Sequence, residues 1–209
     1  MEGDRVNGTI ALRARASIAA LFAGVLACGP AEAHLNATGM GPVYDGLMHF
    51  LTSPEDLVPA VALALLAGLR GAPYARRAMF ALPTAWLLGS LCGLFAALAS
   101  TGTLTASLSF LLLGGLVLAD AKLSPRLLTA LCALLGLFHG YLNGTGMGLS
   151  VQAITAILGL SAAVFVLVVL VAALVVQLRA QWGRIAVRVG GSWIAASGLL
   201  MLGWFIRGT

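Results

Sequence analysis

The sequence SVQAITAILGLSAAVFVLVVLVAALVV, residues 150–176, contains no charged side chain and decides the class of fold. An apolar run of this length exceeds the roughly 20 residues that a helix needs to cross the hydrocarbon core of a bilayer. The rest of the chain of 209 residues is similar in character, because 60% of all residues are hydrophobic and 9% are charged. So few polar residues could not cover a soluble core. The composition predicts an all-α integral membrane protein and excludes a soluble enzyme and a nucleic-acid-binding domain.

Five further apolar segments accompany this run. We expect each of the six to form a membrane-spanning helix, and their approximate ranges are 54–69, 78–99, 103–119, 127–142, 150–176 and 189–206. Several are near or below the usual spanning length, so polar helix ends or a locally thinned bilayer are expected. The sequence therefore predicts a six-helix transmembrane bundle over residues 54–209.

The first 33 residues have the pattern of a cleaved signal peptide. Arginines precede a short apolar run, residues 16–28, and the sequence Ala31-Glu32-Ala33 follows. A positive start, a short apolar stretch and an Ala-x-Ala site are typical of secretory signals. We expect cleavage after Ala33 rather than an uncleaved anchor. His34 would then begin the mature chain, and residues 34–53 would form a segment on the outer face.

The loop charges predict the orientation of the helices. If the mature N-terminus lies outside the membrane, Arg207 is the outer cation, and the inner loops carry the cations Arg70, Arg76, Arg77, Lys122, Arg126, Arg179, Arg184 and Arg188. Such an excess of inner cations is the usual bias of multi-pass proteins. It explains the formal net charge of +5 without an acidic partner. Asp120 lies among these cations, where we expect it to be solvated.

Two glycine pairs predict close helix packing. Gly89 and Gly93 lie four residues apart in the second apolar segment, and Gly136 and Gly140 do so in the fourth. Glycines at this spacing let two helices approach closely in lipid. Packing within one chain is the expected use, and a dimerisation face is the alternative.

All three histidines, and all acids of the predicted mature chain except Asp120, gather on the predicted outer side. They are the three histidines and three acids His34, Asp45, His49, Glu55, Asp56 and His139. Imidazole and carboxylate ligands suit nickel, cobalt, zinc or copper better than magnesium. A site for a divalent transition metal is therefore the main functional indication.

The outer segment offers two metal-binding arrangements. Cleavage would give His34 a free α-amine beside its imidazole, and the two nitrogens could chelate one metal ion; the alternative is an unanchored chain end. Asp45 and His49 are four residues apart, so a helix would place them on one face. Their alternative is an interfacial helix in which the carboxylate orients the histidine.

The first and fourth apolar segments contribute the remaining candidates. Ser53 and Pro54 are typical of a helix start, and Glu55 and Asp56 stabilise its first turn, so capping alone is one interpretation of these acids. Pro59 leaves the carbonyl of Glu55 without its helical donor, which could serve a cation or could mark a simple kink. His139 lies four residues before Asn143, and it could bind metal, carry a proton or make a packing hydrogen bond.

In these residues the chain resembles the HupE/UreJ family of small membrane proteins associated with nickel hydrogenases and ureases. One motif reads His34-x4-Gly39-x-Gly41-Pro42-x-Tyr44-Asp45-Gly46-x2-His49, and a second reads Phe138-His139-Gly140-Tyr141. Many relatives have an Asp-His pair opening the first span, where this chain has Glu55-Asp56-Leu57. Many also have Ala-His-Gly-x-Glu after the second motif, where this chain has Leu142-Asn143-Gly144-x-Gly146. Two histidines and one acid of the fuller pattern are therefore replaced.

The resemblance implies a nickel or cobalt permease that supplies urease or hydrogenase maturation. His34, Asp45 and His49 would capture the ion, and Glu55, Asp56 and His139 would pass it inward, with Tyr44 and Asn143 beside the path. The expected partners are the metal ion, membrane lipid and metalloenzyme-maturation proteins, with no nucleic acid and no permanently bound cofactor. The alternative is a non-transporting accessory protein. An enzyme is not expected, because HExxH and GxSxG motifs are absent from the sequence.

Overall fold

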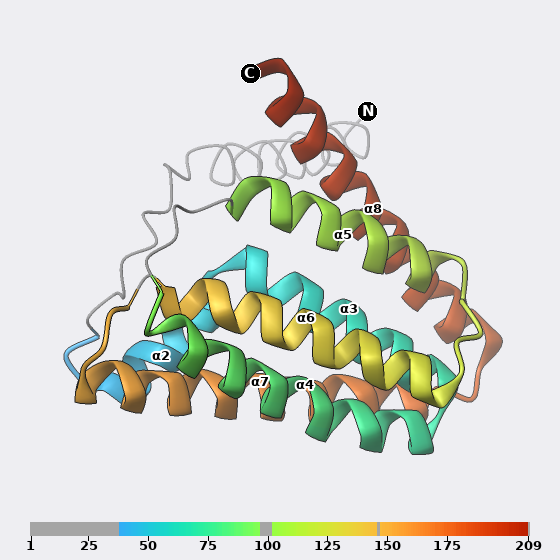
Figure 1. Ribbon diagram of the computed structural model, residues 1–209. Helices are drawn as coiled ribbons and strands as arrows, with labels where there is room; N and C mark the ends of the chain where they lie inside the picture. The colour runs from blue at the N-terminus through green and yellow to red at the C-terminus, as the bar shows by residue number, and fades with distance from the viewer. Residues whose placement is uncertain (1–37, 97–101, 146, 209) are drawn as a thin grey trace, which may run out of the picture. The chain divides into compact units, whose positions relative to one another are not determined.

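The computed structural model describes residues 38–96, 102–145 and 147–208, which lie in one compact unit, His34–Thr209. Within these ranges all regular structure is helical (Figure 1). The seven helices are α2 (Pro42–Thr52), α3 (Pro54–Arg70), α4 (Ala72–Gly93), α5 (Gly102–Leu118), α6 (Pro125–Thr145), α7 (Val151–Val176) and α8 (Gln181–Gly208). The predicted signal peptide and His34 fall outside the described residues.

Each of the helices α3 to α8 overlaps one of the six predicted apolar segments, so the helical part of that prediction is confirmed, although α4 begins and ends six residues before the predicted range 78–99. Among the described residues, α6, α7 and α8 are each long and apolar enough to cross a membrane. The consecutive helices α2 and α3 meet the same criterion together, as a pair bent by 75°. Helix α5 is apolar but shorter. By length and composition, the described helices therefore support three to four membrane spans. The six spans predicted from the sequence are more than these criteria support.

The bend between α2 and α3 arises from local sequence. Ser53 is extended, with φ −97° and ψ 97°, and Pro54 opens α3. A residue before proline is disfavoured in the helical conformation, so α2 ends here. The expected helix start at Ser53 is confirmed, but the Ser53 side chain makes no capping hydrogen bond. The backbone carbonyl of Ser53 instead accepts from the amides of Asp56 and Leu57.

The two predicted glycine pairs pack α4 against α6 within the chain. A Cβ atom on Gly89 would lie 2.2 Å from the carbonyl oxygen of Leu137, and one on Gly140 would lie 2.2 Å from that of Trp86. Real side chains do not tolerate such distances, so glycine is required for this approach. The interpretation of these pairs as intramolecular packing sites is confirmed.

Glycines also set two other helix contacts. Gly46 of α2 lies against the backbone of Ala156 on α7, where an added Cβ would be 1.9 Å from the carbonyl oxygen. Gly114 of α5 and Gly191 of α8 allow a similar approach between those helices. Helices α5 and α8 contact the remaining helices mainly through α3. The described residues thus form a larger group of α2, α3, α4, α6 and α7, joined by α3 to the α5–α8 pair (Figure 1).

Ion pairs connect α3, α8 and the turn after α5 at the end of the helices that is predicted to face inward. Asp120, in the turn after α5, pairs with Arg70 at the end of α3 and with Arg184 of α8, the latter at 3.4 Å. Arg184 also donates two hydrogen bonds of 3.2 Å to the carbonyl of Leu69. The expectation that Asp120 is merely solvated is wrong, because these cations surround it.

Candidate functional site

Five polar side chains form a continuous chain of hydrogen bonds through the helices. In order of contact they are His49 of α2, Asn143 of α6, Asp56 of α3, His139 of α6 and Ser109 of α5. We call this set the polar chain. It links the consecutive helices α2 and α3 to α5 and α6, which lie some way along the sequence, and its central members are buried in an otherwise apolar interior.

Asp56 and His139 form the centre of the polar chain. The Oδ1 atom of Asp56 lies 3.0 Å from Nδ1 of His139, and the residues are 5% and 2% exposed. The break at Ser53 places Asp56 in the first turn of α3, where its side chain is buried. Opposite an ionised carboxylate, which can only accept a hydrogen bond, His139 donates from Nδ1. The pair satisfies two polar groups that would otherwise be costly to bury.

Asn143 orders the outer half of the polar chain. Its Nδ2 atom donates to Oδ2 of Asp56 at 2.8 Å and to the carbonyl of His139 at 2.9 Å. Its Oδ1 atom therefore faces Nε2 of His49, at 3.0 Å. Because an amide oxygen only accepts, His49 donates from Nε2. A neutral His49 then keeps its lone pair on Nδ1.

Ser109 completes the polar chain from α5, and the sequence analysis did not single it out. Its Oγ atom lies 3.0 Å from Nε2 of His139, and both residues are buried. The missed signal is the alternating run Thr103-x-Thr105-x-Ser107-x-Ser109 in an otherwise apolar helix. Hydroxyl groups in an apolar helix often mark contacts with polar groups on neighbouring helices.

The aromatic ring of Trp86, from α4, packs beside His139. The Trp86 and His139 rings have centroids 5.5 Å apart, and Trp86 packs edge-on against Phe50 of α2 at 5.8 Å. The indole nitrogen of Trp86 and the hydroxyl of Ser90 are buried without a hydrogen-bond partner among the described residues. Unpaired polar atoms of this kind are unusual in a folded interior, and here they lie on the helix that lines the polar chain.

The polar chain includes four of the predicted residues, namely His49, Asp56, His139 and Asn143. Glu55 is partly buried beside Asp56 but outside the polar chain, and Tyr44 is half exposed. His34 lies outside the described residues. The part of the chain that the structure describes holds no group of three or more His, Cys, Asp or Glu side chains arranged around a common metal position.

Asp45 has a local role in the structure. Its Oδ1 atom accepts hydrogen bonds from the amide and hydroxyl of Thr38, at 2.6 and 2.7 Å. Asp45 lies in the outer segment ahead of α3, and these hydrogen bonds lower its pKa below the usual value. The carboxylate therefore fixes the segment just before α2 through Thr38. In the described structure no hydrogen bond joins Asp45 to His49.

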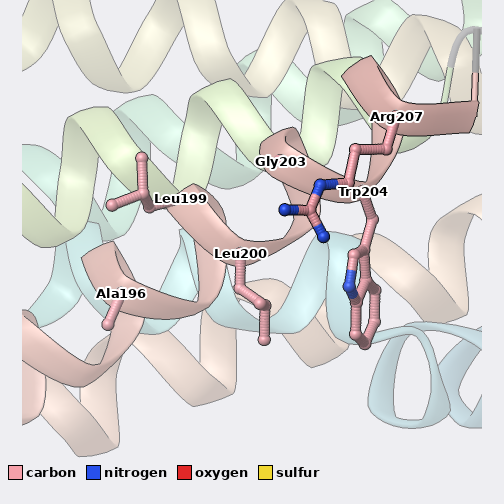
Figure 2. Close-up of a pocket in the computed structure, with 6 residues that line it drawn as sticks. All are labelled: Ala196, Leu199, Leu200, Gly203, Trp204 and Arg207. Carbon is pink, nitrogen blue, oxygen red and sulfur yellow. The ribbon is translucent and has the colours of Figure 1, made fainter.

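A hollow on α8 is a separate surface (Figure 2). It is lined by Ala196, Leu199, Leu200, Gly203, Trp204 and Arg207, all from α8. These residues offer a cationic guanidinium and no carboxylate or imidazole. The hollow therefore lacks ligands for a metal cation, and the polar chain is the candidate site.

Comparison with known proteins gives one match. The model of the family described as HupE / UreJ protein matches residues 19–201, a range that includes the whole polar chain. No curated protein and no solved structure matches the chain.

Proposed function

The chain belongs to the HupE/UreJ family, and from that premise we propose that it carries a divalent transition metal, nickel or cobalt, across the bacterial inner membrane. In this proposal α3 to α8 cross the membrane and the mature N-terminus is outside. The metal would serve urease or hydrogenase maturation. The protein acts as a permease rather than as an enzyme.

The observation that supports this proposal best is the buried pair of Asp56 and His139. Ionisable side chains inside membrane helices are costly and generally mark ion or proton pathways. A carboxylate and a neutral imidazole are also suitable ligands for nickel and cobalt. The pair lies in the helical group where such ligands would meet an ion moving between helices.

The polar chain suggests an order of transfer. His49 is only partly buried, and a neutral His49 that donates from Nε2 offers its Nδ1 lone pair to an arriving cation. Capture there, with His34 and Asp45 contributing from the outer segment, would be followed by exchange past Asn143. Asp56 and His139 would then receive the ion. No nucleotide-binding loop occurs in the sequence, so transport would be passive, ion-coupled or dependent on a partner.

A second candidate is a non-transporting accessory protein that binds metal or an assembly factor. It is favoured by the mutual pairing of the polar chain, in which Asp56 already accepts hydrogen bonds at both oxygens. In such a protein the pair would only hold the helices together.

Uptake of radioactive nickel separates the two candidates. Cells that express the protein should accumulate nickel, with cobalt, zinc and copper tested as competitors, and His139→Gln should abolish most of the accumulation. Ser161→Ala is the control, because Ser161 is buried on α7 without a hydrogen-bond partner among the described residues. Absence of uptake by a well-expressed wild-type protein that still binds nickel after purification would favour the accessory role.

A further inference from the structure

The Ser109 hydroxyl engages the ring nitrogen of His139 that would bind a metal. Since His139 donates from Nδ1 to Asp56, a neutral ring carries its lone pair on Nε2. Ser109 lies 3.0 Å from that atom and must donate its hydroxyl hydrogen to it. A metal ion binds imidazole through the same lone pair, so the hydroxyl and the ion exclude each other.

We infer that Ser109 is a positioning residue that competes with the transported cation for Nε2 of His139. This inference rests on the proposed function, because it assumes a cation at His139. In the empty protein Ser109 fixes the ring tautomer and protects the lone pair. When the cation binds, the hydroxyl must turn away.

The position of Ser109 gives this competition a mechanical consequence. Ser109 belongs to α5, which packs closely on α8 through Gly114 and Gly191. The α5–α8 pair contacts the other helices mainly through α3, so the Ser109–His139 hydrogen bond is a direct polar link from this pair to α6. Cation binding would break that link and let the α5–α8 pair move relative to α6, while the ion pair of Asp120 with Arg70 still holds the pair to α3. Ser109 thereby couples occupancy of the site to a helix movement, and a ligand shifts such an equilibrium through its different contacts in the two states.

Replacement of Ser109 should separate binding from transport. Ser109→Ala removes the competing donor, so nickel should bind about 2- to 10-fold more tightly, as expected for loss of one hydrogen bond. The maximal uptake rate should not rise along with the affinity for nickel. The variant lacks the Ser109–His139 hydrogen bond, which in this inference couples cation binding to the movement of α5 and α8. Ser109→Thr retains the hydroxyl and should restore both values.

Ser107 provides the matched control on the same helix. It is also buried, but its hydroxyl donates to the carbonyl of Thr103 at 2.6 Å within α5. Ser107→Ala therefore removes a buried hydroxyl of α5 without touching His139. It should leave both the affinity and the maximal rate of the wild-type protein unchanged.

Two measurements on the purified full-length protein test the inference. Nitrogen-15 NMR of labelled histidine, without metal, should show the Nε2 signal of His139 shifted in Ser109→Ala and unchanged in Ser107→Ala, with His139→Gln assigning the signal. Calorimetric titration with nickel alone should show the tighter binding, and uptake kinetics should show the split between affinity and rate. Ser109→Cys, a similar shape with a weaker donor, replaces the alanine variant should that variant not fold.

The outcomes distinguish this inference from the proposed function. If the wild-type protein neither binds nor transports nickel or cobalt, the permease proposal fails, and the competition at Nε2 fails with it even if the NMR shift is present. If the wild-type protein transports nickel but Ser109→Ala behaves like Ser107→Ala in NMR and in binding, the role of Ser109 is overturned and the permease proposal stands.

Discussion

Asp56 and His139 are 83 residues apart in the sequence, yet their side chains meet at 3.0 Å in the buried interior. Their contact joins α3 to α6, whose direct packing is otherwise sparse. Helix α4 lies between these helices in the chain and packs its glycines against α6. The contact therefore depends on the α4–α6 packing as well as on the break before α3.

Replacement of Asp56 by asparagine should impair both folding and uptake. His139 and Asn143 face different oxygens of Asp56, and asparagine puts an NH2 donor in place of one of them. One buried donor then loses its acceptor, and about 1–3 kcal/mol of stability should be lost. Thermal unfolding in detergent measures the stability, and nickel uptake per amount of membrane protein should fall by at least roughly 10-fold.

Glu55→Gln is the comparison for the effect on stability. It removes a negative charge from the same helical turn and leaves the polar chain intact. Equal unfolding temperatures for Asp56→Asn and wild type would show that the hydrogen bonds of Asp56 contribute nothing to the fold.

A methyl group at Gly140 should separate α4 from α6. The added Cβ would lie 2.2 Å from the Trp86 carbonyl oxygen, so the helices must move apart, with about 1–3 kcal/mol or more of overpacking cost. Gly115→Ala is the control, because nothing lies within 4 Å of a Cβ there. The expected result in detergent is a lower unfolding temperature for Gly140→Ala alone, and similar values for both variants would contradict the close packing.

Stability should depend on Asp45 in a defined range of pH. The hydrogen bonds from Thr38 lower the Asp45 pKa in the folded protein, so their contribution is present above the ordinary carboxyl value of about 4 and is lost as pH falls through the lower folded value. Asp45→Asn should therefore be less stable than wild type at neutral pH, and the difference should disappear in strong acid. A difference that does not change with pH would mean that the charge of Asp45 is irrelevant.

Cysteine labelling should establish the orientation. With the native cysteines replaced, Leu149→Cys in the α6–α7 connection should react with an impermeant reagent in intact cells. Lys122→Cys in the α5–α6 connection should react only after permeabilisation. Both side chains are exposed, so access depends on the side of the membrane. The reverse pattern would invert the topology and place the outer segment inside.

Much of the helical framework could be predicted from sequence, because hydropathy and glycine spacing are local signals. The ranges of α3 to α8 and the contact of Gly89 and Gly140 with the facing helix follow from such signals. The number of membrane crossings does not follow as directly, because α3 and α5 are short and α4 carries Arg76 and Arg77 near its start.

The candidate site was predicted only in part, because pairing between helices depends on their packing. The sequence indicated His139 as an ionisable residue in an apolar segment and Asp56 as a capping acid or metal ligand at a helix start, but it did not indicate that they bind each other. Ser109 was missed since serine is common in membrane helices. Asp45 was placed with His49 by spacing alone, whereas Thr38 holds its carboxylate.

The bend before α3 has an electrostatic consequence. Because Asp56 lies in the first turn of α3, its buried carboxylate is next to the partial positive charge of the helix macrodipole, equivalent to roughly half an elementary charge. An ionised carboxylate carries a full negative charge and outweighs this partial charge, so a negative potential remains for the proposed cation. With a neutral residue at position 56, the partly buried Glu55 would be the remaining acid of this turn. The bend that delivers Asp56 to His139 thus also places a buried carboxylate at a positive helix end, where each charge stabilises the other.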